Sequence, residues 1–102
     1  MNVNEKIILK AKILGAIEYV TFYKKLSSTL GDEDTWPCTK ETAQAEYESY
    51  MTMYDILTTL ALEMRPSGLD VHQWLSITDE DIKQAKTLAY KHIEWCREEA
   101  KA

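Results

Sequence analysis

The chain has 102 residues, of which 45% are hydrophobic and 28% charged, and its formal net charge is −5. This length fits a single domain with a small hydrophobic core, so we expect residues 1–102 to form one domain. The composition excludes a disordered chain, and the acidity argues against nonspecific nucleic-acid binding, which depends on lysine and arginine contacts to phosphates.

The N-terminal segment is partly apolar, but charged residues interrupt it from Glu5 to Lys12 and no small-residue cleavage site follows. No apolar run approaches the roughly 18 residues that a membrane span needs. The two cysteines, Cys38 and Cys96, stand far apart and fit reduced thiols better than a disulfide framework. We therefore expect a cytoplasmic protein.

The first predicted element is a helix over about residues 4–30. Its apolar residues surround most of the helix, whereas one packing partner needs a stripe only about 100° wide or somewhat more. Such a helix is expected either to lie centrally among three helices or to pack against a second chain. We predict a homodimer to which Ile7, Leu14 and Ile17 contribute, because soluble monomers rarely leave large apolar patches in water.

An acidic run from Gly31 to Asp34, followed by Trp36 and Pro37, interrupts the first helical pattern. The second helix is predicted to begin after Thr39 as its N-cap. It should end before Pro66, which lacks an N–H and disfavours helical geometry at the residue before it. Residues 31–64 carry eight acidic residues and one lysine, so the second helix belongs to the acidic part of the chain.

Two further elements follow. A short helical turn capped by Asp70 is expected to fold over one end of the bundle. The last helix should begin at Thr78, because Thr78-x-x-Asp81 is a variant of the capping box. No segment alternates like a strand, so the sequence predicts an all-α bundle of three long helices plus a short helical turn. The expected buried face of the last helix comprises Ile82, Ala85, Ala89, His92 or Ile93, Cys96 and Ala100.

The second helix carries three tyrosines on one stripe, Tyr47, Tyr50 and Tyr54. They fit either a core seam, opposite small residues such as Ala85 and Ala89 of the last helix, or a docking surface. The docking interpretation is based on the enrichment of Tyr, Trp and Met where protein interfaces bind most strongly. The residues predicted to bind a partner are Glu46, Tyr50, Met53, Tyr54 and Asp55, together with Trp36 in the loop.

No catalytic, cofactor or metal site is predicted. His92 and Cys96 share a helix face, but Cys38 and His72 each stand alone, whereas structural zinc sites show two closely spaced ligand pairs. The chain has no glycine-rich phosphate loop, nucleophile elbow or metalloprotease motif, so we expect no enzyme. Two alternatives stay open: a helical metal-dependent nucleotide hydrolase, suggested by carboxylates on helices, and an acidic mimic of DNA.

In size, acidity and lack of a chemical motif, the whole chain resembles the small accessory proteins encoded by bacteriophages and mobile elements. Such proteins commonly bind one host or competitor protein. The resemblance implies a non-enzymatic regulator, either a stoichiometric inhibitor or an antirepressor, and it assigns no role to any residue. We expect the partner to be another protein, with no direct contact to nucleic acid or membrane.

Overall fold

The computed structural model describes residues 3–101, which form three long helices and one short one. These are α1 (Val3–Thr29), α2 (Lys40–Met64), α3 (Val71–Leu75) and α4 (Asp79–Lys101). The predicted all-α helical bundle is therefore confirmed, including the short helix before the last long one. None of the helices within residues 3–101 is long and apolar enough to cross a membrane.

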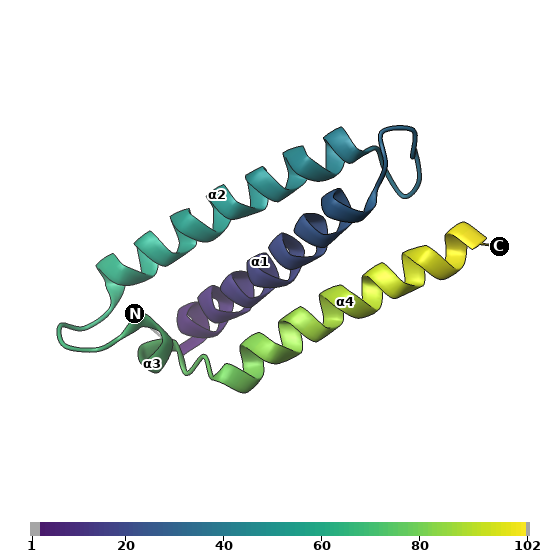
Figure 1. Ribbon diagram of the computed structural model, residues 1–102. Coiled ribbons are helices and arrows are strands. Elements are labelled where there is room, and N and C mark those ends of the chain that lie inside the picture. Colours follow the sequence, from purple (N-terminus) through teal and green to yellow (C-terminus); the bar gives the residue numbers. More distant parts are fainter. Residues whose placement is uncertain (1–2, 102) are drawn as a thin grey trace.

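Helix α1 lies between α2 and α4 (Figure 1). α2 runs antiparallel to α1, α4 returns in the direction of α1, and α3 lies at one end (Figure 1). α1 packs against both long helices, whereas the described parts of α2 and α4 do not approach each other. The result is an elongated molecule of 50 × 23 × 19 Å. This central position explains why α1 has apolar residues on two sides, although Ile7 and Ile8 near its start stay exposed.

The core forms two clusters, one toward each end of α1. At the α3 end, Ile13 is fully buried, and Leu14 and Ile17 pack against the same cluster. At the other end, Leu26 and Leu30 meet residues of α2 and α4. The first cluster consists of Leu9, Ile13, Ala61, Val71, Trp74, Leu75 and Ile77, and the second of Leu26, Leu30, Ala43 and Ile93.

The inner face of α4 follows the predicted pattern in part. Ala85, Ala89 and Cys96 are buried as expected, and Ile93, rather than its neighbour His92, takes the inward position. His92 and Ala100 are exposed, and Ile82 is half-buried. The buried face is narrow because α1 is the one long helix that α4 contacts within the described residues.

Side chains cap three helices where the sequence predicts them. Thr39 Oγ1 accepts a hydrogen bond of 3.1 Å from the Thr42 N–H at the start of α2. The Asp70 carboxylate accepts one of 2.9 Å from the His72 N–H at the start of α3. At α4, Thr78 and Asp81 exchange reciprocal bonds of 3.0 and 3.1 Å, which confirms the capping box.

A lysine of α1 fixes the junction between α3 and α4. Ser76 ends α3 with a positive φ of 57°, and its carbonyl oxygen accepts a 2.8 Å hydrogen bond from Lys10 Nζ. The same ammonium lies 3.3 Å from Asp81 Oδ2. One turn earlier, Lys6 Nζ lies 5.6 Å from the centre of the Trp74 ring. These contacts hold α3 and the start of α4 against α1.

Candidate partner-binding site

The predicted partner-binding residues lie on α2, apart from Trp36, which lies in the loop between α1 and α2. Tyr54 is half-buried and packs against the core cluster around Ile13. Tyr50 is half-buried between two tyrosines of α1. Tyr50 and Tyr54 of the tyrosine stripe therefore face α1. The stripe does not face the alanines of α4 named as its counterpart above, because α2 and α4 do not approach each other within residues 3–101.

Tyr50 stacks on Tyr19 and Tyr23. Its ring centroid lies 4.9 Å from that of Tyr19 and 5.7 Å from that of Tyr23, with interplanar angles of 22° and 10°. Burial, and then the nearby Glu46 carboxylate, raise the pKa of the Tyr23 hydroxyl, with a further contribution from Tyr50. The hydroxyl therefore stays protonated at neutral pH and acts as a packing group rather than as a base.

The remaining predicted residues on the second half of α2, Met53 and Asp55, are exposed. Beside Met53 lie two exposed apolar side chains that the sequence analysis missed, Ile56 and Leu60. The pattern that could have found them is a 3-4 spacing, which puts residues on one face of a helix. Steps of three and four connect Met53 to Ile56 and Ile56 to Leu60.

Trp36 joins a second group of aromatic rings, on the side of α4. Its ring centroid lies 6.3 Å from that of Trp95, and Trp95 lies 6.3 Å from His92. His92 in turn lies 5.3 Å from Phe22 of α1, which meets Tyr23 edge to face at 4.9 Å. Aromatic contacts therefore continue from α2, over α1, to α4 and the loop. The sequence analysis named Trp36 but did not predict its pairing with Trp95.

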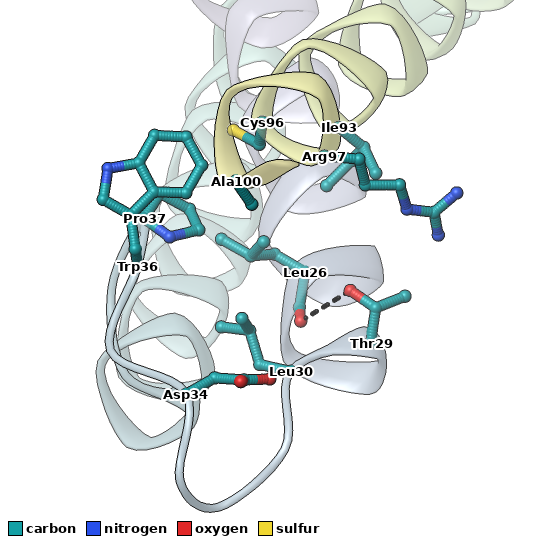
Figure 2. Close-up of a pocket in the computed structure, with 10 residues that line it drawn as sticks. All are labelled: Leu26, Thr29, Leu30, Asp34, Trp36, Pro37, Ile93, Cys96, Arg97 and Ala100. Atoms are coloured by element: carbon teal, nitrogen blue, oxygen red, sulfur yellow. Dashed lines mark hydrogen bonds between the residues drawn. The ribbon is translucent and has the colours of Figure 1, made fainter. Parts of the chain in front are cut away.

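A pocket lies beneath Trp36, between the end of α1 and the end of α4 (Figure 2). We call it the tryptophan pocket. Its volume is about 200 Å³, below the roughly 300 to 1,000 Å³ typical of sites for small molecules. The Arg97 guanidinium extends away from Trp36 (Figure 2). The lining residues are Leu26, Thr29, Leu30, Asp34, Trp36, Pro37, Ile93, Cys96, Arg97 and Ala100.

Local hydrogen bonds shape the turn that precedes Trp36. The Gly31 N–H donates a 2.6 Å hydrogen bond to Asp34 Oδ2, and the Asp34 N–H donates to the Gly31 carbonyl at 3.1 Å. Asp34 is thus bonded within the turn, and Asp32, Glu33 and Asp34 are all exposed. Acidic side chains therefore flank the pocket on the loop side.

Both cysteines lie near this end of the molecule. Cys96 lines the tryptophan pocket and is buried, whereas Cys38 is half-buried against the cluster that contains Leu26. Burial raises the pKa of both thiols; the Glu46 carboxylate adds to the effect at Cys38, and Cys38 adds to it at Cys96. The thiols are protonated at neutral pH, which makes them poor nucleophiles.

No three His, Cys, Asp or Glu side chains of residues 3–101 gather in a group that could hold a metal ion. The arrangement offers contact surface instead: exposed aromatic rings on the loop and α4, and exposed apolar side chains on α2. Tryptophan and tyrosine are among the residues that contribute most of the binding energy in protein interfaces.

Comparisons with family models, with curated proteins and with solved structures found no match to this chain.

Proposed function

We propose that the protein acts by binding another protein, and that the tryptophan pocket receives an apolar side chain of that partner. One observation carries the proposal. Trp36 and Trp95, from separate elements, meet at 6.3 Å beside the pocket and still expose 45% and 55% of their surfaces. Tryptophan is costly to expose, and it is enriched among the residues that dominate binding energy.

The size and charge of the pocket define the chemistry of the partner. A volume of about 200 Å³ suits one or two side chains of a protein better than a whole small molecule. Asp32 and Glu33 lie exposed on the adjoining loop and favour positive charge nearby. The proposed partner therefore presents an apolar anchor flanked by lysine or arginine.

In this proposal the protein is a stoichiometric regulator, either an inhibitor or an antirepressor, that occupies a functional surface of a host or competitor protein. The resemblance to small accessory proteins of bacteriophages and mobile elements supports this role. Of the residues predicted to bind, Trp36 lines the pocket, and Glu46 and Tyr50 lie around Tyr23 on the same half of the bundle. Met53 and Asp55 lie on the second half of α2, away from the pocket.

Affinity capture from host lysate, followed by a measured dissociation constant for the captured protein, tests the proposal. Trp36→Ala should weaken binding about 30-fold, the scale of an interface hot spot near 2 kcal/mol, and leave the melting temperature within a few degrees. Tyr90→Ala is the matched control, because Tyr90 is an equally exposed aromatic residue of α4 outside the pocket. Equal affinity of all three proteins for the captured partner would contradict the proposed site.

Two other functions give different results with the same preparation. Magnesium-dependent turnover of a nucleotide by the purified chain, lost on substitution of its helical carboxylates, would identify a hydrolase. Competition with duplex DNA for a captured DNA-binding protein would identify a DNA mimic, for which the acidic run of the loop, residues 32–34, and the acidic residues of α2 are the relevant feature. Neither result is expected if the tryptophan pocket is the site of binding.

A further inference from the structure

A groove lined by lysines lies between α1 and α4, apart from the tryptophan pocket. Its volume is about 410 Å³, which falls within the roughly 300 to 1,000 Å³ typical of sites for small molecules. It shares no lining residue with the tryptophan pocket. We call it the lysine groove, and its lining residues are Val20, Thr21, Lys24, Lys25, Ser28, Lys86 and Tyr90.

The charges that line the lysine groove are all positive. Lys24 and Lys25 of α1 and Lys86 of α4 are exposed, and no carboxylate is among the lining residues. None of the three lysines takes part in an ion pair within residues 3–101. A chain with a net charge of −5 therefore carries a groove in which three positive charges gather. Charges of one sign that line the same cleft reinforce one another and attract ions of the opposite sign.

The charged residues around the groove leave this local excess in place. On α4 the neighbouring charges, one turn before and one turn after the lining residues, are Lys83 and Glu94, which are of opposite sign. The nearest acid of α1, Glu18, lines a separate hollow together with Lys91. The acidic residues 32–34 follow the end of α1 and do not line the groove. The field inside the groove is therefore set by its own lysines.

The length of the groove limits the size of the ligand. Its α1 residues run from Val20 to Ser28, which is about 12 Å along a helix that rises about 1.5 Å per residue. The groove therefore suits one small molecule better than an extended polymer.

The polar groups that remain available favour a phosphate beside a planar ring. The Thr21 and Ser28 hydroxyls donate to backbone carbonyls of α1 at 2.7 and 2.8 Å, which leaves the ammoniums and the Tyr90 hydroxyl as side-chain donors to a ligand. Lysine ammoniums bind phosphate as point charges. The Tyr90 side chain is 49% exposed, and the bases of nucleic acids stack on aromatic rings of this kind.

We propose that the lysine groove binds a nucleoside di- or triphosphate, with the phosphates between the lysines of α1 and α4 and the base on the Tyr90 ring. Three lysines oppose the charge of two or three phosphates better than that of one. The lining residues include no carboxylate or histidine that could serve as a general base, so the nucleotide is a bound ligand and is not turned over there.

Isothermal titration calorimetry with AMP, ADP and ATP at low ionic strength tests the binding. ADP and ATP should bind more tightly than AMP, and Lys86→Gln should weaken ADP binding about three- to fivefold, the scale of one exposed charge contact. Lys91→Gln is the matched control, because Lys91 is an exposed lysine of the same helix that lines the separate hollow. The absence of ADP and ATP binding, or equal weakening by the two variants, would overturn the proposal.

The position of the base is tested with pyrophosphate, which has the charge but lacks the ring. Tyr90→Leu should weaken ADP binding at least about fivefold, through lost stacking, and leave pyrophosphate binding unchanged, whereas Tyr90→Phe should retain the affinity for ADP. Equal losses for ADP and pyrophosphate, or no loss for either, would overturn the placement of the base.

Two further measurements separate this ligand from other occupants. A short single-stranded RNA that bound more than about tenfold more tightly than ADP would overturn the assignment to a small molecule. Trp36→Ala should leave ADP binding unchanged, since Trp36 lines the tryptophan pocket and not the lysine groove. A loss of ADP binding in that variant would contradict the separation of the two sites.

Discussion

Lys10 of α1 contacts both sides of the junction between α3 and α4: its ammonium donates to the Ser76 carbonyl at the end of α3 and lies 3.3 Å from the Asp81 carboxylate at the start of α4. Asp81 also accepts a hydrogen bond from the Thr78 N–H. One carboxylate therefore completes a helix cap and an ion pair between helices. Both the helix cap and the ion pair therefore depend on the negative charge of Asp81.

Asp81→Asn should make stability less sensitive to acid. The Thr78 N–H, and then Lys10 and the Thr78 hydroxyl, hold the pKa of Asp81 below its ordinary value of 3.8. Because the pKa is lowered in the folded state, this stabilisation is present above the unfolded-state pKa and is lost as pH falls through the folded one. The melting temperature of the wild type should therefore fall more than that of the variant between about pH 6 and pH 2. Parallel profiles would show that the charge of Asp81 is unimportant.

Ile13→Ala should destabilise the protein by about 2 to 5 kcal/mol, through lost burial and a residual cavity. Ile13 is fully buried in the cluster at the α3 end. Ile7 lies on the same helix but is 60% exposed, so Ile7→Ala should change stability by no more than about 0.5 kcal/mol. Urea denaturation followed by circular dichroism measures both. A comparable loss in the two variants would mean that Ile7 is covered in solution.

Tyr50→Ala should cost about 2 kcal/mol, because it removes two stacked ring contacts from a half-buried position. Tyr50→Phe keeps the ring and should retain most of the stability. Thermal unfolding of the two variants separates the ring from the hydroxyl. If Tyr50→Ala left the melting temperature unchanged, the stack with Tyr19 and Tyr23 would contribute nothing to folding.

Both thiols should react slowly in the native protein at neutral pH. Burial raises the pKa of Cys38 and Cys96, so few thiolates are present, and access is limited at Cys96 above all. Reaction with a chromogenic disulfide reagent should be at least about tenfold slower than with free cysteine, with Cys38 modified first. In denaturant the two should react alike. Fast reaction of Cys96 in the folded protein would contradict its burial.

The ends of the helices could be predicted because local chemistry sets them. Thr39, Asp70 and the Thr78–Asp81 pair bond within a few residues of themselves, and Pro66 acts on its neighbour. The neighbours of the tyrosine stripe could not be predicted in the same way. A stripe shows that a face is covered, but the order of helices in space decides whether alanines of α4 or Tyr19 and Tyr23 of α1 cover it.

At the candidate site, too, the local features could be predicted from the sequence and the contacts between distant segments could not. Trp36 was identified as an unusual aromatic residue in a loop, which is a local property. Its contact with Trp95 spans 59 positions of sequence and depends on where α4 ends beside the loop. The spacing of the exposed Ile56 and Leu60 is present in the sequence, but the tyrosines form a second stripe on the same helix. The sequence alone does not show which of the two stripes packs against another helix. Only packing shows which stripe is covered.

The separation of α2 from α4 has a consequence for how energetic effects combine. Ala61 of α2 and Ala89 of α4 are both fully buried, and each should lose about 1 kcal/mol or more as glycine, through backbone entropy and lost contacts. Because the described parts of their helices do not approach each other, the two losses should add to within about 0.5 kcal/mol in the double variant. By contrast, a substitution in α1 should show a coupling free energy with a substitution in α2 and also with one in α4. The two outer helices would then affect each other only through α1.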